Sequence, residues 1–426
     1  MGSAMPHLVV LEPDPRGHTF EWLEFLIRAA GEREPAQRVT FLVAKELEER
    51  LSAAFRNALP ESVKLVALSQ KALSCCVSPN LALSGMTRWW IMRRYLKRLG
   101  ADYGLFLCLD HLSLPLALGL RAGGREISGI LFRPSIHYGE AFGTRSHRRE
   151  RVRDLRKRIL YALMLRNKSL RRIFSLDPYF VEWVEGNLDT GGKIVQIADP
   201  ILLSPQAGPR PEETSRDRFE FLLFGELTRR KGLLVLLAAL EHLHPLVADR
   251  CAVVIAGRIE DALRSETATR MAALRRNQPS LSIELRDRRL SPEEVDALVR
   301  RCDFVLAPYQ RFVGSSGVVL RAADAGKPIL TQDYGLLGRL ASDHGLGAAV
   351  DTTDSRRLAE AISSAACQGM DGHFDPVRTA DFAATHSPHF FAATIFGDYE
   401  ETRVKRDAIA ENDTLVPRTG HASLLS

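Results

Sequence analysis

Short apolar runs alternate with amphipathic stretches along most of the chain. The stretches between the runs place apolar residues three and four positions apart, as in helices that bury one face. Strands and helices that alternate in this way form parallel sheets covered by helices on both faces. The expected strands are residues 7–12, 38–43, 63–68, 103–109, 126–132, 172–176 and 193–198, followed by 219–224, 252–256, 282–285, 303–307, 328–331 and 347–350.

A polar segment with three prolines, residues 205–218, separates the two series of strands and has the composition of a linker. We therefore expect an α/β protein with two Rossmann-like, doubly wound domains, residues 1–204 and 219–375, facing each other across a cleft. Helices over 376–401 are expected to pack back across the domains. The polar tail 402–426 is expected to be disordered.

Composition narrows the class of protein. The 426 residues are 45% hydrophobic and 26% charged, as in ordinary globular proteins. No apolar run reaches the roughly 18 residues of a membrane span, and the N-terminus lacks the pattern of a signal peptide. We therefore expect a cytoplasmic protein. The six cysteines show neither metal-site spacing nor a disulfide framework, and we expect no metal and no cofactor.

Residues 303–331 read as a strand, a loop and a helix. Ser315 and Ser316 are good N-cap residues, and Gly314 and Gly317 leave room for a ligand to approach the backbone. The free N–H groups and the dipole of such a helix start favour an anion. An ordinary helix cap on a loop is the alternative.

A second such turn follows the strand 219–224. It contains Gly225 and three consecutive cations, Arg229, Arg230 and Lys231, before an apolar helix. Arginine can grip a phosphate with two hydrogen bonds, and lysine acts as a point charge. Two anion-binding turns at strand ends of one sheet predict a diphosphate site.

Polar residues also follow strands of the first domain, where ligands of parallel sheets bind. We expect them to bind an acceptor, although a histidine at a strand end is often a buried structural group. Arg286, in the second domain, either contacts a nucleotide base or lies in a solvated loop. The acceptor candidates are Gly17, His18, Asp110, His111, Arg133 and His137.

The second half resembles the donor domain of the retaining GT-B glycosyltransferases, the large family-four group. The first half is similar to that family in architecture only. The matching runs, in order, are FGELTRRKGLLVLLAAL, VVIAG, LSPEEVDALVRRCDFVLAPY, GSSGVVLRAADAGKPIL and GLGAAVDTTDSRRLAEAI.

The resemblance implies a nucleotide-diphosphate sugar held by the second domain and an acceptor held by the first. Lys231 falls on the family's diphosphate-binding lysine, whereas Glu226 stands where an arginine is usual. Val313 and Arg321 occupy the places of two glutamates, one near the reacting sugar and one at the nucleotide ribose. These departures leave open an alternative, a non-catalytic protein that binds nucleotide sugar or serves as a scaffold.

The implied activity is metal-independent, retaining transfer of a hexose to a glycan or lipid-linked acceptor, in the synthesis of cell-envelope polysaccharides or glycoconjugates. In this interpretation Lys231 and Arg230 stabilise the leaving diphosphate. Asp110, His111 and His137 orient or polarise the acceptor hydroxyl.

One basic segment dominates the charge. Residues 145–172 carry twelve Lys or Arg and two acids, a net +10 within a chain of +6, so the remainder sums to −4. Val152, Leu155, Ile159 and Leu163 follow helical spacing, with Leu160 and Met164 beside them. The segment is either a helix packed on the first domain with a solvated face, or a site for an anionic membrane surface. Aromatic residues are not interleaved with the charges, and we expect no nucleic acid partner.

Overall fold

The structure is a computed structural model that describes residues 6–15, 19–33, 37–56, 58–138, 148–201 and 218–400. The chain forms two compact units. The first contains residues 1–107, 121–128 and 389–426, and the second contains residues 108–120 and 129–388. The expected linker, apart from Arg218, the tail 402–426, and Gly17 and His18 lie outside the described residues.

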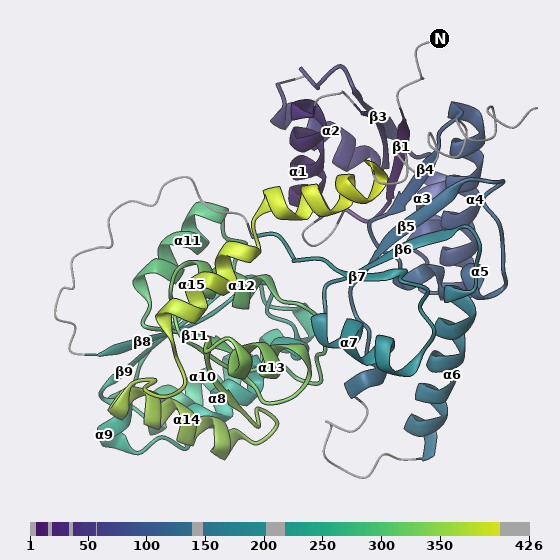
Figure 1. Ribbon diagram of the computed structural model, residues 1–426. Helices are drawn as coiled ribbons and strands as arrows, with labels where there is room; N and C mark the ends of the chain where they lie inside the picture. The colour runs from purple at the N-terminus through teal and green to yellow at the C-terminus, as the bar shows by residue number, and fades with distance from the viewer. Residues whose placement is uncertain are drawn as a thin grey trace, which may run out of the picture. The chain divides into compact units, whose positions relative to one another are not determined.

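Two sheets form the framework (Figure 1), with the strand orders β3-β2-β1-β4-β5-β6-β7 and β10-β9-β8-β11-β12-β13. The registered pairs are parallel, for example β1 with β2 and β8 with β9. The strands are β1 His7–Glu12, β2 Arg38–Val43, β3 Val63–Ala67, β4 Tyr103–Phe106, β5 Glu126–Leu131, β6 Leu170–Ser175, β7 Ile194–Gln196, β8 Phe219–Phe224, β9 Cys251–Ala256, β10 Ser282–Arg286, β11 Phe304–Ala307, β12 Ile329–Gln332 and β13 Gly347–Val350.

Helices connect most of the strands, as parallel pairing requires. They are α1 Thr19–Glu32, α2 Lys45–Ala54, α3 Gln70–Cys76, α4 Leu81–Leu99, α5 Ser113–Ala117, α6 Arg148–Leu165, α7 Pro178–Asn187, α8 Leu233–Glu241, α9 Pro245–Ala248, α10 Asp261–Asn277, α11 Pro292–Arg301, α12 Gly317–Asp324, α13 Gly335–Asp343, α14 Ser355–Gln368 and α15 Pro376–Thr385. Residues 388–400 are also helical.

The second sheet is buried on both faces. Along β8, Phe221 and Leu223 belong to one apolar core and Leu222 and Phe224 to the other. The first core is closed by α8, α10 and α14, and the second by α11, α12, α13 and α15. This double burial explains why the central strands β8, β9 and β11 read as nearly continuous apolar runs rather than alternating ones.

The two-domain Rossmann-like fold expected from the sequence is confirmed, with the strands close to their expected bounds. The strand expected over 103–109 ends earlier, at Phe106, because the chain then turns into a 3₁₀ helix at Asp110–Leu112. Within the described ranges, no helix combines the length and apolar character that crossing a membrane requires.

The described part of the basic segment forms the expected helix, α6, but the apolar row that its spacing indicates is not the buried face of that helix. Leu155, Ile159 and Leu163 of α6 are 59%, 53% and 39% exposed. Met164 and Leu165 are buried instead. The helix therefore packs through a row beside the expected one and leaves apolar side chains among its charges.

A buried carboxyl lies in the first unit. Glu12, the last residue of β1, is 4% exposed, and its Oε1 accepts a hydrogen bond of 2.9 Å from the N–H of Asp14. Burial raises the pKa of Glu12 to about 7, and the positive charge of buried Arg88 opposes this rise. Ionisation of Glu12 therefore works against folding.

We predict that the Glu12→Gln variant shows a weaker loss of stability with rising pH than the native chain. The pKa of Glu12 is higher folded than unfolded, so the folded state binds the extra proton and stability falls from about pH 4.5 through pH 7. The cost at pH 8 is roughly 3 kcal/mol. Denaturation midpoints of both proteins at pH 5 and pH 8 measure it, and parallel profiles would contradict it.

Candidate functional site

The predicted anion-binding turns lie at the carboxyl ends of adjacent strands. β8 pairs with β11, with Phe221 opposite Phe304. From β8 the chain adds β9 and β10 on one side of the sheet, and it then adds β11, β12 and β13 on the other side. The order in which strands are added therefore reverses between β8 and β11. In open parallel sheets this switch point is where ligands bind.

The two loops touch through their backbones. The N–H of Gln310 donates to the carbonyl of Arg230 at 2.8 Å. Gly232 has a φ of 76°, and a Cβ built there would lie 1.9 Å from the carbonyl oxygen of Pro308. Only glycine permits this approach, so the cationic turn is held directly against the loop after β11.

Ser316 is the N-cap of α12, as expected from the sequence. Its Oγ accepts a hydrogen bond from the N–H of Val318 at 3.3 Å. The first N–H groups of a helix have no partner within the helix and carry the positive end of its dipole. Ser315 beside it donates from Oγ to the carboxylate of Asp199. These contacts hold the start of α12 in place, so its free backbone N–H groups are fixed hydrogen-bond donors.

Tyr309 joins the two turns. The Lys231 ammonium donates to the Tyr309 hydroxyl, which lies 2.6 Å from Ser316 Oγ. The same ammonium lies 4.5 Å from the centroid of the Tyr309 ring. Lys231 and the start of α12 therefore converge on one place. Tyr309 could not be recognised as a site residue from the sequence, because an aromatic residue after a buried strand is typical of the core, and Tyr309 is indeed only 1% exposed.

Arg230 and Arg133 lie at the same place. The Arg230 guanidinium carbon is 4.3 Å from the Phe312 ring centroid. A Cβ built on Gly314 would lie 3.2 Å from Arg133 Cγ, so Arg133 packs on the loop that precedes α12. The pKa of Arg230 is lowered by burial first and also by the charge of Arg133. Arg133 was expected on the acceptor side, and the structure places it beside the diphosphate candidates.

The side chains of these cations are not held in ion pairs. In the part of the chain that the structure describes, Arg133, Arg229, Arg230 and Lys231 form no ion pair with a carboxylate. Arg229 donates a hydrogen bond to the Glu260 carboxylate at 3.2 Å, but through its backbone N–H and not through its guanidinium. Adjacent cations and a helix N-terminus are together an arrangement that favours a polyvalent anion.

The carboxylate of Asp110 accepts hydrogen bonds from two backbone N–H groups. Its Oδ2 accepts from the N–H of Phe132 at 2.9 Å, and its Oδ1 accepts from the N–H of Arg133 at 3.2 Å. Burial is the main cause that raises the pKa of Asp110. The geometry shows that Asp110 positions the loop bearing Arg133. The catalytic and acceptor roles of Asp110 and of half-buried His111 stay predictions.

His137 forms a buried pair. Its Nε2 lies 3.0 Å from Asp177 Oδ2, and the two side chains are 2% and 0% exposed. Tyr138 donates its hydroxyl to the same carboxylate oxygen at 2.7 Å, and Asp177 also caps α7. Of the two interpretations left open by the sequence, this geometry agrees with the structural one. A role for His137 in acceptor binding or catalysis stays a prediction.

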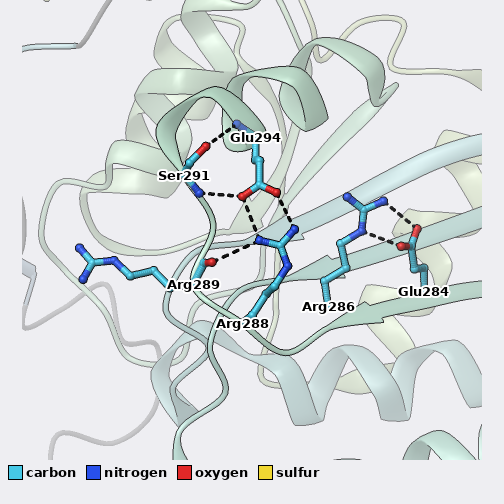
Figure 2. Close-up of polar contacts among 6 residues, drawn as sticks. All are labelled: Glu284, Arg286, Arg288, Arg289, Ser291 and Glu294. Carbon is cyan, nitrogen blue, oxygen red and sulfur yellow. Dashed lines mark hydrogen bonds and ion pairs between the residues drawn. The ribbon is translucent and has the colours of Figure 1, made fainter.

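Figure 2 shows the surroundings of Arg286 at the end of β10. Its guanidinium binds Glu284 through two contacts, of 2.6 and 3.1 Å. Arg288 binds Glu294, which also closes the capping box with Ser291 at the start of α11. Arg286 is therefore already paired, and its contact with a nucleotide base stays a prediction.

Arg321 stands where the resemblance would place a glutamate. Its Nη1 lies 2.7 Å from Oδ1 of Asp296 on α11. Burial and the charge of Asp296 raise the pKa of nearby Asp324. A carboxylate is therefore present close to the place of the missing glutamate, supplied by a different helix.

Comparisons with known proteins identify similarity in the second half of the chain and in the fold. Residues 218–367 match the family model described as Glycosyl transferases group 1. No curated protein matches the chain. The resemblance noted in the sequence is confirmed: residues 218–367 are similar to group 1 glycosyltransferases, and the chain has the GT-B type of fold.

Three solved structures illustrate the similarity of fold. Sucrose-phosphate synthase from Thermosynechococcus elongatus has a TM-score of 0.67 and 14% identity, covering 94% of this chain and 100% of its own. Anabaena HepE in complex with UDP has a TM-score of 0.59 and 15% identity, covering 94% and 100%. WaaG, a glycosyltransferase involved in lipopolysaccharide biosynthesis, has a TM-score of 0.60 and 16% identity, covering 92% and 100%.

We predict that Tyr309→Phe lowers the affinity for inorganic pyrophosphate severalfold, by about 1 kcal/mol, since Lys231 and Ser316 both lose the hydroxyl that aligns them. Calorimetry measures the change. Tyr179→Phe is the matched control, because it removes a hydroxyl bound at 2.7 Å to Asp343. Equal losses in the two variants, or none in Tyr309→Phe, would contradict the prediction.

Proposed function

We propose that the protein is a metal-independent, retaining glycosyltransferase that moves a hexose from a nucleotide-diphosphate sugar to a glycan or lipid-linked acceptor. The observation that carries this proposal is the convergence of Lys231 and the start of α12 through Tyr309, with Arg230 beside them. A diphosphate carries negative charge to pair with these cations and oxygens to accept hydrogen bonds from these donors. The match of residues 218–367 to the glycosyltransferase family supports the same assignment.

The proposed chemistry follows from where charge develops. When the bond between the sugar and the diphosphate breaks, negative charge accumulates on the leaving phosphate. Lys231, Arg230 and the N–H groups of Ser316 and Gly317 would stabilise that charge without reorganising. The acceptor hydroxyl would attack the same face of the sugar and give its proton to an oxygen of the departing diphosphate, so the anomeric configuration is retained. Arg133, held by Asp110, would add a further cation.

Two similar structures support the substrate classes. Anabaena HepE was solved with UDP and glucose, and WaaG is involved in lipopolysaccharide biosynthesis. By analogy, we propose a nucleotide sugar as donor and an acceptor of the cell envelope, reached by a cytoplasmic enzyme that associates peripherally with an anionic membrane. The basic segment 145–172 is one proposed contact with that membrane.

A second candidate is a protein that binds nucleotide sugar without transferring it. Val313 and Arg321 favour it, because the two glutamates implied by the resemblance are replaced. The ion pair of Arg321 with Asp296 brings a carboxylate close to one of these places, but that carboxylate is already paired and does not separate the two candidates. Transfer measured with the purified protein separates the two candidates.

We predict that one class among UDP-, GDP-, ADP- and dTDP-sugars raises the thermal midpoint of the protein. For that donor, Lys231→Ala should weaken binding by ten- to a hundredfold, about 1.5–3 kcal/mol, by removing a charge-assisted contact. Lys327→Ala, which removes a lysine beyond the opposite end of α12, is the control and should bind normally. Unchanged affinity in Lys231→Ala would remove Lys231 from the site.

We further predict retention of configuration. The first-formed product, examined by proton NMR before it can equilibrate, should carry the same anomeric configuration as the donor. An inverted product would contradict the retaining mechanism while leaving the diphosphate site intact. Binding of a nucleotide sugar with no transfer to any acceptor would favour the second candidate.

A further inference from the structure

We infer that the outer face of α4 is a docking surface for an anionic lipid bilayer. The inference concerns a helix of the first compact unit that lies outside the basic segment 145–172 in the sequence. It rests on the membrane association proposed above and does not depend on the identity of the donor. It begins with charge. Residues 62–101 contain no Asp or Glu and seven Lys or Arg, a net +7 in a chain of +6, so the remainder sums to −1.

The N-terminal half of α4 exposes apolar side chains. Leu81, Leu83 and Trp90 are 64%, 47% and 51% exposed, and Val77 in the preceding loop is 37% exposed. Leu83 and Trp90 are seven residues apart and therefore share one face of the helix. Neighbouring Trp89 is 1% exposed, so Trp89 packs in the core while Trp90 faces solvent. The exposed group is larger than the scattered single side chains of an ordinary surface.

The following turns of α4 are basic. Arg93, Arg94, Lys97 and Arg98 are exposed, and among the described residues none of them has an ion pair. Elsewhere exposed cations pair along their own helix, as Arg28 does with Glu24 and Arg270 with Glu266. The Arg93 guanidinium carbon lies 5.2 Å from the Trp90 ring centroid, which brings the apolar and basic groups together.

These features fit a lipid headgroup region better than other partners. Tryptophan prefers the membrane interface, and unpaired Lys and Arg are attracted to an anionic leaflet. The opposite face of α4 is committed to the core through Ser84, Arg88, Trp89, Met92 and Leu96. The helix can therefore lie on a bilayer but not cross it. A nucleic acid would be expected to meet a row of stacking aromatics, and α4 exposes one tryptophan.

The test is sedimentation of the full-length protein with vesicles of phosphatidylcholine alone or with one third phosphatidylglycerol. We expect binding to the anionic vesicles, weakened by salt. Replacing Arg93, Arg94, Lys97 and Arg98 by Gln should lower the partition coefficient at least tenfold. Leu83→Ser with Trp90→Ala should lower it severalfold at unchanged charge, and Trp90→Phe should restore part of the loss.

Matched controls come from the second unit. Arg270, Arg275 and Arg276 on α10 replaced by Gln remove comparable charge, and Leu246→Ser removes an exposed leucine, 75% exposed. Both controls should bind vesicles normally. Thermal midpoints and nucleotide-sugar affinity, measured in parallel, show whether each variant is folded and keep this test separate from that of the proposed function.

Three outcomes would overturn the inference. The α4 variants could bind anionic vesicles like the native chain. Binding could be lost only when Leu155 and Ile159 of α6 are replaced by Ser, which would assign the contact to α6. The protein could ignore vesicles yet bind an oligonucleotide through α4, which would assign this face to a nucleic acid.

Discussion

The structure of the candidate site depends on concentrated positive charge that, among the described residues, forms no ion pair with a carboxylate. Lys231, Arg230 and Arg133 lie close to the positive end of α12, and burial together with this crowding lowers the pKa of Arg230. Such an arrangement costs free energy while it is empty. The rigid support around it, from the Gly232–Pro308 contact to the hydroxyl of Tyr309, holds the cations together despite their repulsion. A bound diphosphate would relieve that repulsion, which is why we assign the site to an anionic leaving group.

Much of this site could be predicted from the sequence, because its parts are local. A run of apolar residues predicts β11, and a serine before an apolar helix predicts the cap at Ser316. The consecutive cations after β8 can be read directly from the sequence. Contacts between distant residues could not be predicted. Nothing in the sequence shows that the Tyr309 hydroxyl reaches Lys231, or that Arg133 packs on Gly314.

In the first domain, the sequence predicts the positions of candidate residues but not the orientation of their side chains. The sequence places Asp110 and His137 after strands of the first sheet, and the structure agrees. It does not show where their side chains point. Both are held by partners inside the protein, Asp110 by backbone N–H groups and His137 by Asp177. Likewise the spacing of α6 indicates an apolar row but not that this row faces solvent. Orientation depends on tertiary packing, which periodicity does not determine.

The most direct test of the account is a crystal structure of the protein with a bound nucleoside diphosphate. The account predicts that the terminal phosphate contacts the Lys231 ammonium and the backbone N–H groups of Ser316 and Gly317 at the same time, with Tyr309 between them. A phosphate that touches only one of these groups, or a nucleotide bound away from the ends of β8 and β11, would contradict it.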